Sequence, residues 1–254
     1  MIKKISVILL TLFSFQVFGW GLTGHRTVGE IAQRHLSRKA SKKIEQILKC
    51  KSIAVASNWM DDVKSDSVYD HTHSWHWVTI PDGQTYEESE KNPDGDLIQT
   101  IEALITKLKA GNLSAQDEAE SLSMLIHLIG DIHQPLHVGN GQDLGGNKLK
   151  VEWFWEKSNL HRVWDSDMID SQKFSYTEMA TNLDKVSKDK IKEWQASTVR
   201  DWARESMALR DQVYDLPHDN KINYEYRYKN WETLELRLTQ AGIRLAGVLN
   251  DIYE

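Results

Sequence analysis

Residues Leu125 to Val138 have the sequence LIHLIGDIHQPLHV, an apolar stretch that contains three candidate metal ligands, His127, Asp131 and His137. His127 and Asp131 are four residues apart, a spacing that places both side chains on one face of an α-helix. Pro135 ends that helix, so His137 lies just beyond it. A simpler explanation is a buried helix in which His127 and Asp131 bond to each other and His137 is an ordinary loop residue. Evidence elsewhere in the chain has to decide between the two.

The first residues of the chain have the pattern of a secretory signal. Two lysines at positions 3 and 4 precede an apolar run over residues 5–18, which is shorter than the ~20 residues that span a bilayer. Small residues follow at the positions that a signal peptidase requires, ending with Gly19. We therefore expect residues 1–19 to be cleaved and residues 20–254 to form one exported domain without a membrane anchor.

Composition narrows the class of protein further. Without the two lysines of the signal, 29 basic residues stand against 37 acidic residues, a net charge of −8. This charge disfavours a protein that grips nucleic acid through a broad basic surface, although bound cations would change the sign locally. Cys50 is the single cysteine, so the chain has no internal disulfide and depends on its core and on any bound metal for stability.

Hydrophobic residues recur at helical spacing through most of the chain, which predicts an all-α fold in a single compact domain. The expected helices cover residues 26–36, 39–48, 53–64, 97–109, 114–134, 187–214 and 224–253. Alternating apolar residues predict one short β-hairpin near residues 148–163. The acidic segment 82–96 is expected to be a surface loop, and the last two helices are expected to be scaffold.

Further candidate ligands lie near apolar helices or between tryptophans. His25 lies near the start of the first helix, and Asp61 lies at the end of the third. His76 stands between Trp75 and Trp77 and is expected to be buried, unlike the neighbouring histidines at positions 71 and 73. His161 and Asp165 repeat the spacing of four. Judged alone, each of these is more often a structural residue or a solvated edge than a ligand.

Together these motifs resemble a known family. WG at residues 20–21 is followed by His25, HLIGDIHQPLH occupies residues 127–137, and GGN and HRVWD follow at 145–147 and 161–165. The combination resembles the zinc-dependent single-strand-specific nucleases, the 3′-nucleotidase family of fungi, plants and bacteria, whose fold is related to bacterial zinc phospholipases C. The motifs run from Trp20 to Asp165, and the helical remainder fits the family's all-α fold. The resemblance favours the metal-binding explanation of the opening stretch.

The resemblance implies three Zn²⁺ ions bound by imidazoles, carboxylates and the new chain terminus. The ligands of the first ion would be Asp61, His76, His127 and Asp131. The second ion would take the α-amino nitrogen and carbonyl oxygen of Trp20, together with His25 and the other oxygen of Asp131. The third would be bound by His137, His161 and Asp165. Signal cleavage would then be a chemical requirement, because an uncleaved chain has a peptide nitrogen at Trp20 in place of the amine.

The resemblance also implies a mechanism and a substrate. A hydroxide bridging two zinc ions would attack phosphorus, while the third zinc stabilises the phosphate and the leaving 3′ oxygen, so that products keep a 5′-phosphate. Asp61 would orient the attacking water, and Lys64 and Asn147 match family positions near the phosphate. An ordinary surface lysine is an equal alternative for Lys64.

Substrate choice would come from base stacking on Trp77, because every base has a π face. Thr79 occupies the position where fungal members have an Asp that contacts the base edge, so no base preference is inferred. The expected substrates are single-stranded RNA and DNA and 3′-nucleotides. The short signal and the lack of disulfides favour a bacterial protein, periplasmic or secreted, and we expect a monomer.

Two other functions compete with this one. A zinc phospholipase C has a similar ligand set, but that family has Glu where Asp165 stands and a shorter gap between the histidines that match His137 and His161. A periplasmic zinc-binding protein without catalytic turnover would also retain the ligands.

Overall fold

The computed structural model describes residues 20–254, so the predicted signal over residues 1–19 lies outside the described residues. Helices dominate and strands are short, which confirms the predicted fold class. Within the described residues no helix is both long enough and apolar enough to cross a bilayer.

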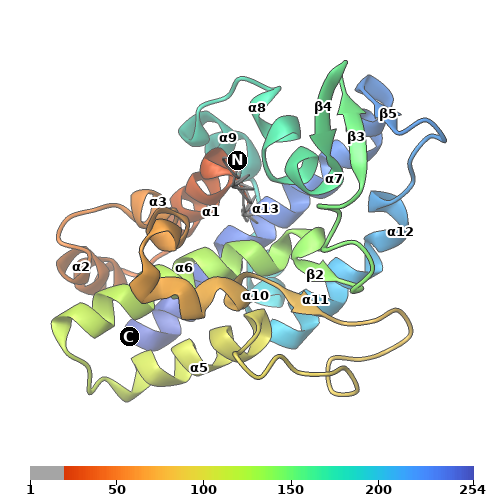
Figure 1. Ribbon diagram of the computed structural model, residues 1–254. Coiled ribbons are helices and arrows are strands. Elements are labelled where there is room, and N and C mark those ends of the chain that lie inside the picture. Colours follow the sequence, from red (N-terminus) through yellow and green to blue (C-terminus); the bar gives the residue numbers. More distant parts are fainter. Residues whose placement is uncertain (1–19) are drawn as a thin grey trace, which may run out of the picture.

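The described chain begins with helix α1 and ends with helix α13, and the short strands lie between them in the sequence (Figure 1). The α-helices are α1 (Leu22–Arg34), α2 (Arg38–Ile47), α3 (Ile53–Ala56), α4 (Trp59–Asp62), α5 (Leu97–Ala110), α6 (Ala115–His133), α7 (Leu160–Arg162), α8 (Met168–Asp170), α9 (Tyr176–Leu183), α10 (Lys188–Gln195), α11 (Val199–Ala208), α12 (Arg210–Val213) and α13 (Tyr224–Tyr253). Tighter or wider helical turns are η1 (Val63–Ser65), η2 (Ser67–His76), η3 (Pro135–His137) and η4 (Val163–Asp167). The strands are β1 (Val78–Thr79), β2 (Val138–Gly139), β3 (Lys150–Trp153), β4 (Glu156–Asn159) and β5 (Lys221–Ile222).

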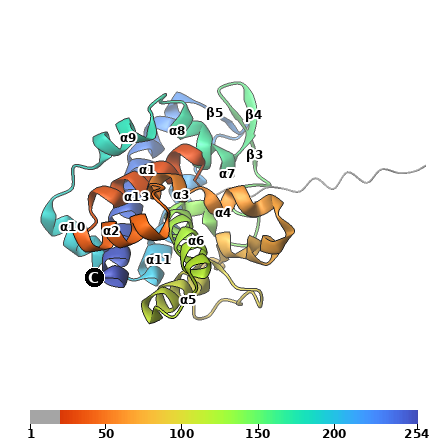
Figure 2. The same ribbon diagram turned by 90° about the vertical axis from the view of Figure 1, so that its left-hand side faces the viewer.

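Helices α1, α6 and α13 form the centre of the molecule, with the other helices around them (Figures 1 and 2). The apolar stripe predicted for the last helix is buried throughout: Leu234, Leu238, Ala241, Leu245 and Leu249. Each large apolar side chain buried in this way stabilises the fold by about 1.5–3 kcal/mol. Gly242 lets α13 approach α1 closely, since a Cβ there would lie 2.6 Å from Ile31. The core therefore holds α1 and α6, the two helices that carry candidate ligands, in fixed relative positions.

The helix that contains the opening stretch agrees with its prediction. Ser114 caps α6 by accepting a hydrogen bond from the backbone N–H of Asp117, and Gln134 ends the helix immediately before Pro135. The predictions for residues 97–109 and 224–253 are confirmed by α5 and α13.

Two predicted helices are wrong in detail. Residues 53–64 form α3 and α4 instead of one helix, with a break at residues 57–58 where the Ser57 hydroxyl donates to the Ala54 carbonyl. Residues 187–214 form α10, α11 and α12, because Thr198 and Asp201 form a capping box that starts a new helix. The first helix also begins earlier than predicted, at Leu22, and neither η2 nor α9 was expected.

The short strands bring distant segments together. β1 pairs with β2 in parallel, with Val78 opposite Val138, so the residues just before them, Trp77 and His137, lie next to each other. β3 and β4 form the predicted antiparallel hairpin, and β5 adds to β3 in parallel. Residues 82–96 contain no helix or strand, as the loop prediction required.

Candidate metal centre

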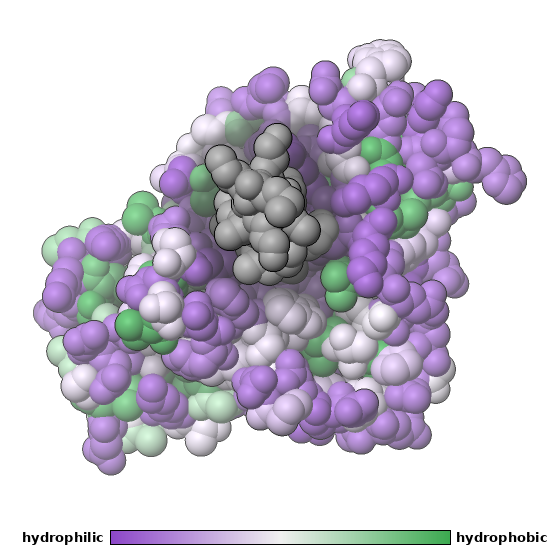
Figure 3. All heavy atoms as spheres, in the orientation of Figure 1, coloured by the Kyte–Doolittle hydropathy of each residue, from purple (hydrophilic) through white to green (hydrophobic). Residues whose placement is uncertain are grey.

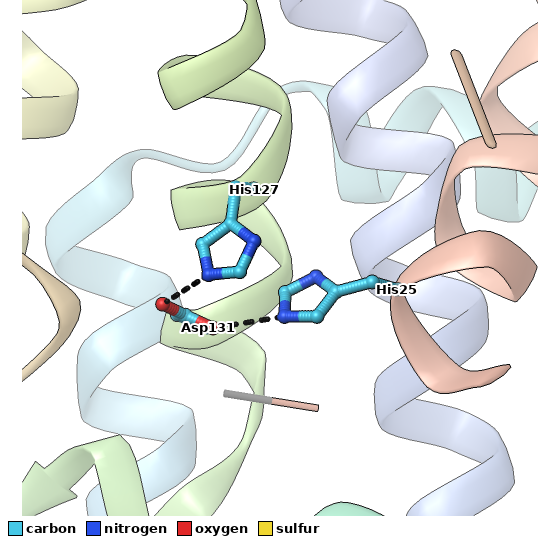
Figure 4. Close-up of side chains that lie close together, drawn as sticks. All are labelled: His25, His127 and Asp131. Atoms are coloured by element: carbon cyan, nitrogen blue, oxygen red, sulfur yellow. Dashed lines mark ion pairs between the residues drawn. The ribbon is translucent and has the colours of Figure 1, made fainter. Parts of the chain in front are cut away.

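His127 and Asp131 lie one turn apart on α6 and are fully buried. Their side chains meet as the spacing predicts, with His127 Nε2 3.3 Å from Asp131 Oδ2 (Figure 4). The second oxygen of Asp131 points toward α1, where His25 Nε2 lies 3.3 Å from Oδ1. Asp131 thus offers one oxygen to each of two groups of histidines.

His25 reaches this position because α6 has no side chain at Gly130. The imidazoles of His25 and His127 stack at 3.9 Å with an interplanar angle of 20°. A Cβ at position 130 would lie 2.8 Å from His25 Nδ1, too close for the ring to remain where it is. The glycine in the opening stretch is therefore part of the site.

A second group combines Asp61 and His76 with His127. His76 Nδ1 lies 2.9 Å from Asp131 Oδ2 and 3.1 Å from His127 Nε2, and Asp61 Oδ1 lies 3.7 Å from His127 Nε2. The break between α3 and α4 contributes here, because the Ser57 carbonyl accepts a hydrogen bond from His127 Nδ1 at 2.7 Å. That bond places the lone pair of the ring on Nε2, facing Asp61 and His76.

A third group contains His137, His161 and Asp165. His161 Nε2 lies 3.1 Å from Asp165 Oδ2, and His137 Nε2 lies 4.0 Å from Asp165 Oδ1. The Nδ1–H of His137 donates to the His76 carbonyl at 2.5 Å, and that of His161 donates to the Gly145 carbonyl at 2.6 Å. Both rings therefore turn Nε2 toward the carboxylate, the arrangement of metal-binding histidines.

Among residues 20–254, groups of His and Asp whose donor atoms lie close enough to share one metal ion occur in three places. Their members are His25, His127 and Asp131; Asp61, His76 and His127; and His137, His161 and Asp165. All eight side chains were predicted as ligands, and the structure brings them into three groups. His127 belongs both to the group with His25 and Asp131 and to the group with Asp61 and His76, whereas the expected sets assigned it to the first ion alone. Whether they bind metal stays a prediction.

Several buried nitrogen and oxygen atoms in these groups have no hydrogen-bond partner within residues 20–254, and a zinc ion would satisfy them. His25 Nδ1 and Nε2, His76 Nε2 and Asp131 Oδ1 are buried and have no hydrogen-bond partner among the described residues. Each such group costs about 1–3 kcal/mol unless a ligand satisfies it. Imidazole nitrogens and carboxylate oxygens are the donors that zinc favours.

Burial keeps His76 and His137 in the neutral form that can bind a metal. It lowers the pKa of His76 to about 3 and that of His137 to about 4, so both rings are neutral at pH 7. Burial would raise the pKa of Asp131, but the neighbouring His127 and His137 outweigh it and hold that pKa well below its usual range. Burial raises the pKa of Asp165 to about 6.

Three predicted site residues lie beside these groups. Trp20 is fully buried, and the next residue, Gly21, donates its N–H to the Asp165 carbonyl at 2.8 Å. Lys64 Nζ lies 2.6 Å from Asp61 Oδ1. Asn147 is buried, and its amide donates to the Leu144 carbonyl at 3.0 Å.

The predicted base-binding residues lie at the edge of the centre. Trp77 is half-buried and Thr79 is exposed, and both line a pocket of 230 Å³ whose other wall is the 82–96 loop. The loop is anchored there because Trp75 Nε1 donates to the Asp94 carbonyl at 2.9 Å. Residues 71 and 73 are exposed histidines, as predicted.

Sequence reasoning missed the groups that orient the ligands. Gln134 Nε2 donates to Asp165 Oδ1 at 2.6 Å, while its Oε1 accepts from the N–H of Leu136. Gln134 stands within the opening stretch, but nothing in the local pattern connects it to a residue 31 positions away. The backbone carbonyls of Ser57, His76 and Gly145 also orient histidine rings, and because every residue has a carbonyl, the sequence cannot show which ones do so.

A helical core that encloses three neighbouring groups of His and Asp able to hold a metal ion defines an α-helical protein with candidate metal sites. Over residues 20–254 the chain matches the sequence model of the S1/P1 nuclease family, and it belongs to that family. This confirms the resemblance inferred from the motifs.

Curated relatives cover nearly the whole chain. Endonuclease 3 of Arabidopsis thaliana is 30% identical, covering 98% of this chain and 94% of the relative. Endonuclease 2 of the same plant is 28% identical over 99% of this chain and 97% of its own length. Nuclease P1 of Penicillium citrinum is 27% identical, covering 92% of this chain and 98% of the relative.

Proposed function

We propose that this protein is a zinc-dependent endonuclease that hydrolyses phosphodiester bonds in single-stranded RNA and DNA and also removes phosphate from 3′-nucleotides. The observation that carries the proposal is the set of buried His and Asp groups around α6, in a chain of the S1/P1 nuclease family. Relatives that match the chain over nearly its full length are named endonucleases and nucleases.

We assign three Zn²⁺ to the observed groups. Asp131 would serve two of these ions, because its oxygens face His25 on one side and His76 with His127 on the other. His137, His161 and Asp165 would bind the third. The amine and carbonyl of Trp20 would complete the ligands beside His25, after cleavage of residues 1–19.

When bound, the zinc ions would make a hydroxide available near neutral pH and would offset the charge of the phosphate and of the departing 3′ oxygen. The residues around them have separate tasks. Asp61 would orient the attacking water and accept its proton, and its 2.6 Å contact with Lys64 Nζ holds the carboxylate in place. Lys64 and Asn147 would contact phosphate oxygens. Trp77 offers its ring to an unstacked base, which a duplex does not supply.

Export follows from the same proposal. The family match begins at Trp20, the residue expected to follow the signal. Cleavage there would create an α-amino group with a pKa near 8, which a metal can deprotonate. We propose a bacterial periplasmic or secreted monomer.

The test uses the chain that begins at Trp20, with zinc measured by elemental analysis and a substrate panel of single-stranded DNA, RNA, 3′-AMP and phosphatidylcholine. We expect three zinc ions per chain, hydrolysis of the nucleic acids and of 3′-AMP, and loss of activity on chelation. Three bound zinc ions with all nucleic-acid substrates left intact would contradict the proposal. Faster release of diacylglycerol than of nucleotides would favour the phospholipase.

Two variants complete this test. Asp61→Asn is expected to abolish hydrolysis while most zinc remains, which a protein that only binds zinc could not show. A chain with extra residues left before Trp20 should contain less zinc and be less active. Equal zinc content and activity in that chain would show that the terminal amine is not a ligand.

A further inference from the structure

The charge of this protein is unevenly distributed along the chain. Residues 38–51, which form α2 and the turn after it, contain six basic residues and one acidic residue, a net charge of +5. The remaining residues of the 20–254 region contain 23 basic and 36 acidic residues, a net charge of −13. The six basic residues are all exposed: Arg38, Lys39, Lys42, Lys43, Lys49 and Lys51. We call this segment the basic ridge.

The basic ridge separates two cavities. One has a volume of 640 Å³ and is lined by Lys39, Lys42 and Lys43 from α2, together with Lys109 and the C-terminal residues. The other has a volume of 610 Å³ and lies between the turn after α2, helix α4 and the start of α6. Figure 2 looks onto the face where α2, α3, α4 and α6 lie side by side. On the left of Figure 3, hydrophilic and hydrophobic residues alternate over the same elements.

The 610 Å³ cavity combines lysines with aromatic rings. Lys49 and Lys51 stand on one wall and Trp59 and Tyr69 on another, and the two rings meet edge to face at 5.3 Å. Two acidic residues, Asp62 and Glu120, also line it. Grooves that bind single-stranded nucleic acid pair cations for the phosphates with aromatic rings for the bases.

This cavity adjoins the metal centre through α4. Asp61 on that helix faces His127 at 3.7 Å, whereas its neighbour Asp62 lines the cavity, so a four-residue helix separates the two. A strand bound at the metal centre would reach the basic ridge only by continuing past α4.

We propose that the basic ridge and its two cavities form an accessory binding site for the single-stranded substrate beyond the nucleotide that is cleaved. The proposal rests on the proposed nuclease function. Lys39, Lys42 and Lys51 make no ion pair with any described residue, in contrast to Lys43, which lies 3.5 Å from Glu118. These three ammonium groups are available for phosphates. Trp59 and Tyr69, which line the same cavity as Lys51, favour nucleic acid over an anionic membrane, because a membrane would need no stacking surface.

The experiment compares a ridge triple variant, Lys39→Gln with Lys42→Gln and Lys51→Gln, with a control triple variant, Lys157→Gln with Lys221→Gln and Lys229→Gln. Both sets are exposed lysines, and both variants lose three positive charges. Kinetics are measured with a long single-stranded oligonucleotide and with a dinucleotide over a range of salt concentrations. Binding is measured separately by fluorescence anisotropy of a phosphorothioate-linked oligonucleotide, which requires no turnover.

The ridge variant should raise KM for the oligonucleotide on the order of tenfold. The slope of its log affinity against log salt concentration should become less negative by about 2, which is ~0.7 for each of the three lost phosphate contacts. Its kcat/KM for the dinucleotide should stay within about twofold of wild type, since the ridge lies outside the cleaved nucleotide. The control variant should behave as wild type.

Unchanged oligonucleotide binding, an equal effect on the dinucleotide, or an equal effect of the control variant would overturn the proposal. So would vesicles of anionic phosphatidylglycerol that displace the oligonucleotide from the wild-type protein. If the wild type hydrolyses neither substrate, the proposed function fails, and the anisotropy comparison still decides whether the basic ridge binds single strands.

Discussion

Gly130 is the smallest residue in the opening stretch and has one of the largest effects on the geometry of the site. In an ordinary helix Gly is less favourable than Ala by about 1 kcal/mol, so its presence in the middle of α6 needs a reason. The reason is His25, whose ring occupies the space where a Cβ would stand. The helix gives up intrinsic stability at this residue, and in return α1 can place an imidazole beside Asp131.

Gly130→Ala is expected to keep the helical fold and to lose the zinc that His25 helps to bind, with at least a tenfold fall in kcat. The fully buried ring cannot move away without displacing its neighbours. Zinc per chain, circular dichroism and oligonucleotide hydrolysis measure the effect. Gly247→Ala on α13 is the matched control, because its Cβ would meet only the flexible side chain of Gln195. Wild-type zinc content in Gly130→Ala would disprove the role of the glycine.

At the scale of elements, short strands and a short helix position the segments that follow Trp77 and His137. Arg210, the first residue of α12, donates to the carbonyls of Ile80, Val138 and Gly139 at 2.8–3.0 Å and to Asp82 Oδ1 at 2.8 Å. A single buried guanidinium thereby links the ends of β1 and β2 through their backbone carbonyls. This pair holds the segment after Trp77 against the segment after His137.

Arg210→Met should lower the free energy of unfolding by about 3 kcal/mol, because buried carbonyls lose their donors. Asp82→Asn removes the charge of a carboxylate that is more than half exposed and that also accepts from Asn140, so it should cost less than about 1 kcal/mol. Urea denaturation at pH 7 compares the two variants. Equal costs would mean that the carbonyl contacts contribute little.

At the scale of the whole molecule, a buried charged network ties α6 to α11 and α13. Glu205 accepts hydrogen bonds from Arg237 and Arg244 at 2.6 to 2.7 Å, and Arg237 also donates to the His133 carbonyl. His133 Nδ1–H donates to the Ile129 carbonyl, so its Nε2 accepts from Arg244 at 3.0 Å. Burial, reinforced by both arginines, holds the pKa of His133 well below its usual range.

This network predicts a pH dependence with a definite sign. Below pH ~6.5 the unfolded chain protonates position 133 and the folded protein does not, so the stability that this histidine contributes is present above that pH and is lost as the pH falls. The stability advantage of wild type over His133→Gln should therefore shrink by up to about 1.4 kcal/mol per pH unit between pH 6.5 and pH 5. Urea denaturation of both proteins across this range measures it. Parallel pH profiles would rule out His133 as the titrating group.

Much of the fold could be predicted from the sequence because the information is local. The helices α5, α6 and α13 follow from apolar spacing, and the β-hairpin follows from alternation. Residues 187–214 form separate helices because of a local signal, the capping box of Thr198 and Asp201. The continuous apolar spacing predicted one helix and gave no sign of this boundary. The break at Ser57 has no comparable signal, because its carbonyl is directed to His127, which is 70 positions away in the chain.

The sequence by itself determined which side chains can act and which family they belong to, because ligand types and their spacing within one helix are properties of neighbouring residues. It paired His127 with Asp131 and His161 with Asp165. Only the tertiary structure decided that Asp131 turns one oxygen to α1 and the other to His76, and that Nε2 of His127, His137 and His161 faces the carboxylates. Those choices depend on backbone carbonyls and on an absent side chain at Gly130, which come together only when the helices pack.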